Sequence, residues 1–252
     1  MSGRPASRAE PPGAFVFPSA GRTHEGRVRR LNEDGFVESS RLGLWAVADG
    51  MGGHAAGEVA SRKVVESLAA LPAPASGFGF VRDVTEALKA ANAELIAYAA
   101  GRGADVVGST VVVLLAVDGH YACLWAGDSR GYLFRDGALS PLTRDHSLVQ
   151  ALVDSGALTP AEAKSSRRGH VITKAVGVDP ALELDMVQGP LRDGDLFLLC
   201  SDGLTGVLDE AEIAALLAPA DPDACAERLV AAALSRGAPD NVTVVLVRAE
   251  AA

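Results

Sequence analysis

Four aspartates lie next to apolar, strand-like stretches of the chain. Asp49, Asp128 and Asp202 each follow such a stretch, and Asp240 precedes another. A single carboxylate at the end of a strand is usually a turn residue or a helix cap. If the four strand ends converge, however, the like charges repel one another unless cations neutralise them. Because oxygen ligands favour Mg²⁺ or Mn²⁺ over zinc, the pattern predicts a site for hard divalent cations.

The segment that follows Asp49 combines glycines with an imidazole. Residues 50–57 contain several glycines together with His54, and a helical pattern comes next. Such a turn lets the chain bend sharply and directs the free N–H groups of a helix start at a bound anion. The same segment satisfies the G-x-G-x-x-A pattern of dinucleotide sites. On this stretch alone, a metal site, a dinucleotide site and a simple turn all remain open.

A second charged segment, residues 21–34, is rich in arginine and ends in the acidic pair Glu33 and Asp34. Mixed charges in a short span usually form a solvated loop. Here, however, the arginines come first and the two carboxylates follow. A guanidinium binds two phosphate oxygens at once, so this order places a phosphate-binding fork beside a metal site.

The composition and charge of the chain limit the functional classes to which the protein can belong. The chain has 252 residues, of which 48% are hydrophobic and 22% are charged, with a formal net charge of -9. These values are typical of a soluble globular protein and argue against nucleic acid or an anionic membrane as a partner. The three cysteines are widely spaced, which suits a reducing compartment. No apolar run reaches membrane-spanning length and no signal-peptide core is present, so we predict a cytoplasmic protein.

The predicted elements alternate between helices and antiparallel hairpins. Asp-Gly pairs at 118–119 and 136–137 mark two-residue hairpin turns. Helices are predicted over 58–71, 80–100 and 147–154 and from near Asp209 and Asp221. Strands are predicted over 44–48, 108–117, 121–126, 131–134, 171–176, 182–187, 195–200 and 244–247. Hairpins between helices, and the lack of an acidic residue about twenty positions after the glycines, weaken the dinucleotide hypothesis.

The chain is predicted to form one domain after a short leader. Residues 1–18 are rich in Pro, Gly, Ala and Arg without a sustained period, which is typical of a flexible leader. Residues 19–252 then form a single domain. A long insertion near residues 147–170 separates two strands and is predicted to be a flap over the site.

The motifs taken in order resemble one family. They are Gly-x-Val-Arg-x-x-Asn-Glu-Asp at 26–34, Asp-Gly-Met-Gly-Gly-His at 49–54, Gly-Ser-Thr at 108–110, Gly-Asp-Ser-Arg at 127–130, Leu-Thr-x-Asp-His-Ser at 142–147, Val-Ile-Thr at 171–173, Ser-Asp-Gly-Leu at 201–204 and Asp-Asn-Val-Thr at 240–243. This set is similar to the metal-dependent Ser/Thr protein phosphatases of the PPM, or type 2C-like, family in their bacterial single-domain form. The resemblance implies an α+β fold, a four-layer α-β-β-α sandwich of two mostly antiparallel sheets flanked by helices.

The resemblance also implies a metal-binding role for seven residues. Two cations, Mn²⁺ or Mg²⁺, are expected in each active site, with a weaker third. The expected ligands are Glu33, Asp34, Asp49, the Gly50 carbonyl, Asp128, Asp202 and Asp240. Among them, Asp49 bridges the two cations and Asp128 serves the third site.

Two further residues receive catalytic roles from the resemblance. Arg29 matches the arginine that binds the phosphoryl group, and His54 matches the proposed general acid. The alternative for His54 is a helix-start residue that bonds to the backbone. The implied reaction is hydrolysis of phosphoserine or phosphothreonine by water activated at the binuclear centre.

The implied partners are phosphorylated Ser/Thr proteins, including a Ser/Thr kinase whose action the enzyme reverses, and a monomer is expected. A phosphatase-like module that has lost catalysis is the alternative from another class. It predicts missing metal carboxylates, whereas all of them are present.

Overall fold

Two antiparallel sheets lie face to face in the computed structural model, which describes residues 15–52, 56–104, 106–159, 162–163, 171–218 and 221–252. The first sheet has the strand order β10-β7-β6-β4-β3, and β5 pairs with the end of β4. Its strands are β3 Asp34–Ser39, β4 Leu44–Gly52, β5 Val107–Ser109, β6 Val111–Val117, β7 His120–Ala126 and β10 Asp185–Pro190.

The second sheet has the strand order β2-β12-β11-β8-β9. Its strands are β2 Ser19–His24, β8 Arg130–Arg135, β9 Ala138–Pro141, β11 Leu196–Cys200 and β12 Val242–Arg248. A small third sheet joins β1 Phe15–Val16 to β13 Glu250–Ala251, so the two ends of the described chain pair with each other.

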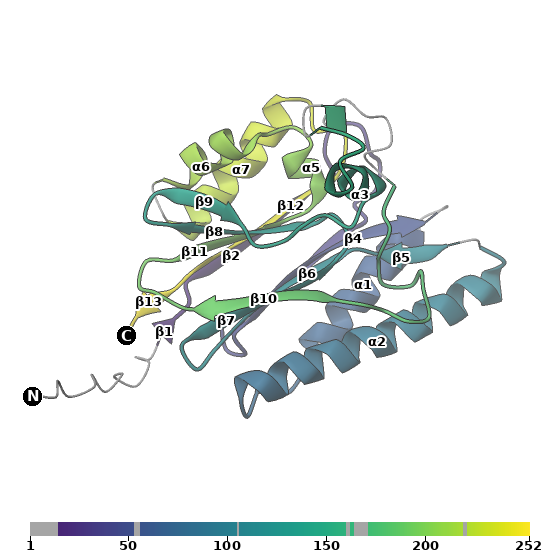
Figure 1. Ribbon diagram of the computed structural model, residues 1–252, viewed down its shortest axis with the longest axis horizontal. Coiled ribbons are helices and arrows are strands. Elements are labelled where there is room, and N and C mark those ends of the chain that lie inside the picture. The colour runs from purple at the N-terminus through teal and green to yellow at the C-terminus, as the bar shows by residue number, and fades with distance from the viewer. Residues whose placement is uncertain (1–14, 53–55, 105, 160–161, 164–170, 219–220) are drawn as a thin grey trace, which may run out of the picture.

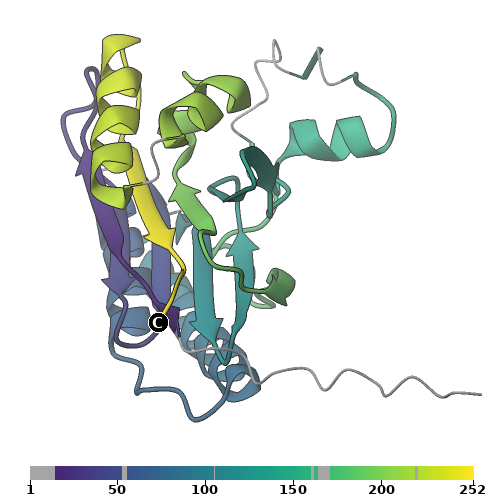
Figure 2. The same cartoon turned by 90° about the vertical axis from the view of Figure 1, so that its left-hand side faces the viewer.

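Helices cover the outer face of each sheet (Figure 1). The first sheet carries α1 Ala56–Ala69 and α2 Gly77–Arg102, and the second carries α5 Asp202–Thr205, α6 Glu210–Leu217 and α7 Pro222–Ser235. Helix α3 Leu148–Asp154 stands apart from these layers at the end of the sheets (Figure 2).

Three separate apolar cores produce the four layers. Phe80 and Leu88 belong to the core between the first sheet and its helices, and Leu229 belongs to the core under α6 and α7. Between the sheets lies a third core that contains Trp45 and Phe197. Alternate residues of a strand face opposite sides of its sheet, so a strand that is buried on both faces is almost continuously apolar. The predicted α-β-β-α sandwich is therefore confirmed.

Local sequence signals explain several element boundaries. The side chains of Asp209 and Asp221 accept hydrogen bonds from the first turns of α6 and α7, as N-cap residues do. Asp118 and Gly119 both have positive φ, 53° and 71°, which is the conformation of a type I′ hairpin turn. These predicted helix starts and this predicted hairpin are confirmed.

Two sequence predictions need correction. Residues 171–176 do not form a strand; they make only two isolated bridges, Ile172 with Ser147 and Val176 with Ser109. The two bridges go to different neighbours, Ser147 before α3 and Ser109 at the end of β5, so no continuous ladder forms along the segment. The predicted leader, residues 1–18, overlaps β1, and the aromatic ring of Phe17 packs against Trp45.

Among the described residues, no helix is both long and apolar enough to cross a membrane.

Candidate active site

Two of the predicted metal ligands, Asp34 and Asp49, lie on neighbouring strands of the first sheet. Asp34 on β3 lies directly opposite Asp49 on β4 in the antiparallel register. The side chain of Ser201, which follows β11 of the second sheet, donates a hydrogen bond of 2.8 Å to Asp34 Oδ2. In turn, Thr243 on β12 donates its N–H to Ser201 Oγ at 3.0 Å. The ends of both sheets therefore meet at Asp34.

Asn241 fixes the loop that carries the arginines. Its Oδ1 accepts a hydrogen bond from the Glu33 N–H at 2.8 Å, and its Nδ2 donates to the carbonyls of Glu25 and Leu31 at 3.0 and 2.9 Å. Its location in the Asp-Asn-Val-Thr motif beside a predicted metal ligand is the signal that sequence reasoning did not use.

Arg29 and Asp240 lie side by side at the mouth of the site. Arg29 Nη2 lies 2.7 Å from Asp240 Oδ2, and about half of the arginine side chain is exposed. Gly26 makes this approach possible because its φ is +81° and a Cβ there would lie 2.2 Å from the Asp240 carbonyl oxygen. The exposed guanidinium is thus available to an incoming anion.

The glycines around Glu33 leave room for its carboxylate. The Gly50 N–H donates to the Glu33 carbonyl at 3.0 Å. A Cβ on Gly57, in the first turn of α1, would lie 2.6 Å from Glu33 Oε1. A Cβ on Gly50 would lie 2.0 Å from the Gly57 carbonyl oxygen, so both glycines are needed for the close approach of β4, α1 and Glu33. Gly50 and Gly57 therefore make space beside a carboxylate, which is a different role from that of the glycines in a dinucleotide fingerprint.

Thr110 connects Asp49 to the turn that carries Asp128. Thr110 Oγ1 accepts from the Asp49 N–H at 3.1 Å and lies 2.7 Å from Ser129 Oγ. Gly127, with φ +118°, passes so close to Thr110 that a Cβ would lie 2.6 Å from the threonine Cβ. Asp128 is consequently held close to the other carboxylates and is only 7% exposed.

Burial and the neighbouring carboxylates raise the pKa values of these acids. Burial, together with the charge of Asp202, raises the pKa of Asp34 and of Asp128 from 3.8 to about 7. Burial followed by the charge of Asp34 raises the pKa of Asp49 well above its ordinary value. The charges of Asp202 and Asp240 contribute to the shifts of Asp34 and Asp49. The predicted convergence of the strand-end acids is therefore present in the structure.

The donor chemistry of the site fits hard cations. Glu33 Oε1 and Asp34 Oδ1 are buried and have no hydrogen-bond partner. Such oxygens are costly unless a cation or water binds them. As the described side chains stand, no three His, Cys, Asp or Glu residues are close enough to hold one ion. The case for cations therefore rests on the buried, unpaired carboxylate oxygens and not on a ready-made set of ligands around one point.

The raised pKa values predict an unusual pH dependence for the metal-free protein. Between pH 3.8 and about 7, folded Asp34 and Asp128 hold more protons than they do in the unfolded chain. The free energy of unfolding therefore falls as pH rises through this range. We expect the melting temperature in chelator to be lower at pH 8 than at pH 5.5. Asp128→Asn should reduce the difference; a wild-type protein that is more stable at pH 8 would contradict this prediction.

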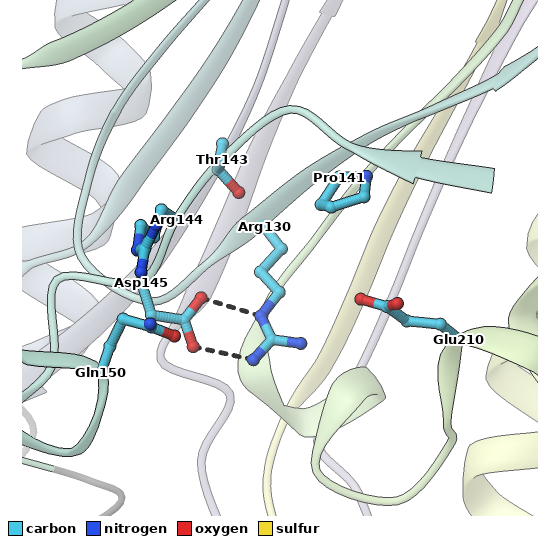
Figure 3. Close-up of a pocket in the computed structure, with 7 residues that line it drawn as sticks. All are labelled: Arg130, Pro141, Thr143, Arg144, Asp145, Gln150 and Glu210. Atoms are coloured by element: carbon cyan, nitrogen blue, oxygen red, sulfur yellow. Dashed lines mark hydrogen bonds and ion pairs between the residues drawn. The ribbon is translucent and has the colours of Figure 1, made fainter. Parts of the chain in front are cut away.

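A cavity of about 310 Å³ adjoins the site on the side of Arg130. Figure 3 shows two parallel bonds from Arg130 to Asp145, with Glu210 on the other side of the guanidinium. None of the predicted site residues lines this cavity, but the charges of two of its lining residues, Arg130 and Asp145, act on Asp128. His54, the predicted general acid, lies outside the described residues.

Comparison of the chain with models of protein families agrees with this geometry. A family model described as Protein phosphatase 2C matches residues 20–235. The chain belongs to the protein phosphatase 2C family. The matched segment contains every predicted site residue except Asp240.

Relatives in this family are similar over most of the chain. The Serine/threonine protein phosphatase PstP of Mycobacterium tuberculosis is 41% identical over 234 residues, which are 92% of this chain and 45% of that protein. The chain thus spans about half the length of this relative.

Two solved structures extend the comparison. PppA, described as a key regulatory component of T6SS in Pseudomonas aeruginosa, is 43% identical and has a TM-score of 0.88, with 94% of this chain and 100% of that chain covered. The catalytic domain of PstP in complex with two manganese ions is 37% identical with a TM-score of 0.86, again covering 94% and 100%.

These comparisons confirm the predicted family and fold. The family model and the relative PstP, which is named a serine/threonine protein phosphatase, place the chain in the protein phosphatase 2C family. The PstP structure holds two manganese ions, which supports the predicted manganese-binding character of the site.

Proposed function

We propose that this chain hydrolyses phosphoserine and phosphothreonine in proteins at a binuclear Mn²⁺ or Mg²⁺ centre. The observation that carries the proposal is a set of interacting carboxylates, buried Asp128 with half-buried Asp34 and Asp49, beside the exposed side chain of Arg29. Such a cluster carries its full negative charge near neutral pH most favourably when cations are bound, and an adjacent arginine supplies an anion site.

The predicted metal ligands divide between the two sheets and the loop. Asp49 with the Gly50 carbonyl, and Glu33 with Asp34, come from the first sheet and the loop before it. Asp202 and Asp240 come from the ends of strands in the second sheet, and Asp128 would serve a weaker third cation. When bound, the cations lower the pKa of a water molecule and neutralise charge on the phosphoryl group.

Arg29 performs the substrate-binding part of the reaction. Its guanidinium donates two parallel hydrogen bonds to a phosphate dianion, which orients the phosphorus for attack from the opposite side. In the structure it pairs with Asp240 Oδ2. A phosphate group that binds at Nη2 would therefore compete with Asp240 for that nitrogen. Substrate binding transfers Arg29 from the carboxylate to the phosphoryl oxygens.

We infer that the substrates are proteins phosphorylated by a Ser/Thr kinase, which is itself a candidate substrate. The net charge of -9 gives no attraction to nucleic acid or to an anionic membrane. We also propose that residues 19–252 act as one phosphatase domain, monomeric and cytoplasmic, with His54 as the acid that protonates the leaving alkoxide.

Metal removal and replacement test the proposal. A phosphothreonine peptide should be hydrolysed in Mn²⁺, left intact after chelation, and hydrolysed again after Mn²⁺ is restored. The matched unphosphorylated peptide in a binding assay serves as the control. Mn²⁺-dependent binding of the phosphopeptide without turnover would instead identify a module that has lost catalysis. Full turnover in chelator would contradict the proposal outright.

A further inference from the structure

Two neighbouring segments connect Asp128 to the flap. The first is residues 125–131, which contain Asp128, and the second is residues 142–147, which lead into the flap. We call their pairing the clasp. Its outer hydrogen bonds run from Leu142 N–H to Gly131 O (2.8 Å), from Gly131 N–H to Thr143 Oγ1 (3.1 Å) and from Trp125 Nε1–H to Arg144 O (2.9 Å). The Arg130–Asp145 pair of Figure 3 adds two bonds of 2.8 Å.

His146 occupies the centre of the clasp. Its backbone N–H donates to the Gly127 carbonyl at 2.9 Å, and its ring Nδ1 accepts from the Gly127 N–H at 3.2 Å. Both polar groups of Gly127 are therefore bonded to one residue. Because Gly127 immediately precedes Asp128, the orientation of its peptide groups determines where the Asp128 carboxylate lies.

The ring of His146 is held from two other sides. It stacks on Trp125 with centroids 5.9 Å apart and planes inclined by 15°. Its Nε2 lies 3.3 Å from Asp185 Oδ2. Burial lowers the pKa of His146, so the neutral ring keeps a lone pair on Nδ1 for the Gly127 N–H. The remaining ring nitrogen, Nε2, then carries the proton; it lies within ion-pair distance of Asp185 but makes no hydrogen bond.

The same residue also closes the base of the flap. Thr173 donates its N–H to the His146 carbonyl at 2.8 Å, and Leu148 donates to the Val171 carbonyl at 2.8 Å. These bonds join the described residues on either side of the predicted flap, directly after His146. On the far side of Gly127, Thr110 bonds the Asp49 N–H. An uninterrupted series of contacts therefore runs from Asp49 through Gly127 and His146 to the flap.

We propose that His146 is a positioning residue for the reaction. Its Nδ1 holds the Gly127 peptide so that Asp128 faces the phosphoryl-transfer site and keeps a fixed position relative to the base of the flap. The inference rests on the proposed function for its kinetic consequence. Its structural consequence, the protection of the Gly127 N–H from exchange, is independent of that function and can be measured in the metal-free protein.

Three substitutions separate the hydrogen bond from the packing of the ring. His146→Asn places an amide oxygen where Nδ1 lies and keeps the acceptor. His146→Gln places its amide oxygen near Nε2 instead, and His146→Phe keeps the stacking on Trp125 but has no acceptor. His120→Asn, at an exposed histidine in the β6–β7 hairpin, is the matched control.

Two measurements on the full chain decide the question. Loss of a partner that orients a ligand typically costs roughly 10–100-fold in metal affinity or activity. We expect the Phe and Gln variants to lose kcat by this factor on a phosphothreonine peptide, with more Mn²⁺ required for half-maximal rate. Hydrogen exchange of the Gly127 amide in chelator should be faster in both. The Asn variant and the His120 control should resemble the wild type in both measurements.

The Asn and Gln variants have side chains of similar polarity, so their comparison remains decisive if the Phe variant is unstable. Equal kcat and equal Gly127 exchange in the Asn and Gln variants would overturn the proposal. A wild-type protein without phosphatase activity would refute the proposed function, and the exchange measurement would still confirm or reject the role of Nδ1.

Discussion

Asp49→Asn should nearly abolish hydrolysis while it stabilises the metal-free protein. The substitution keeps the shape of the side chain but removes the charge predicted to bridge two cations. Metal ions supply several kcal/mol of transition-state stabilisation, so we expect kcat to fall by roughly 10³-fold. In chelator at pH 8, however, the melting temperature should rise, because burial and the neighbouring Asp34 oppose ionisation of Asp49 and raise its pKa.

The opposite signs of these two effects make the prediction specific. Thermal denaturation of both proteins, with chelator and with Mn²⁺, should show that Mn²⁺ stabilises the wild type far more than the variant. The control is Asp195→Asn, at a buried aspartate that makes two 2.6 Å bonds to Arg135 outside the carboxylate cluster. That variant should be less stable and keep its response to Mn²⁺. A lower melting temperature for Asp49→Asn in chelator would show that Asp49 is structural.

The fold could be predicted where local chemistry decides the conformation. Asp209 and Asp221 form helix caps, and Asp118 with Gly119 forms a hairpin turn, because these residue types stabilise those conformations by themselves. Residues 171–176 have the same β-branched character as a true strand. Whether they join a sheet depends on which neighbour the flap brings beside them, and that information is not local.

The sequence predicts the metal-binding carboxylates of the site but not the residues that hold them in place. Asp49 and Asp128 follow apolar runs, and chemistry alone makes converging carboxylates a metal site. The roles of Asn241 and His146 depend on contacts with residues far away in the sequence, such as Glu33 and Gly127. Their side chains also serve equally well in turns and on surfaces. Only the packed structure shows which backbone groups they bind.

Arg29→Ala should separate phosphate binding from metal binding. The structure places Arg29 Nη2 2.7 Å from Asp240 Oδ2, so the arginine contacts both a predicted metal ligand and the space for an anion. Removing one preorganised donor to a developing oxyanion typically costs about 10²–10³-fold in rate. We expect kcat/KM for a phosphothreonine peptide to fall by that factor. Arg29→Lys should recover only part of it, because an ammonium group cannot form the two parallel bonds.

The Mn²⁺ requirement of the same variant tests where the arginine acts. With Arg29 absent, Asp240 loses a cationic partner that competes with metal, so the Mn²⁺ concentration for half-maximal rate should stay equal or fall. Arg30→Ala, at the exposed neighbouring residue, should leave both quantities near the wild-type values. If Arg29→Ala instead raises the Mn²⁺ requirement in proportion to the lost activity, then the arginine acts by orienting Asp240, and another group binds the phosphoryl oxygens.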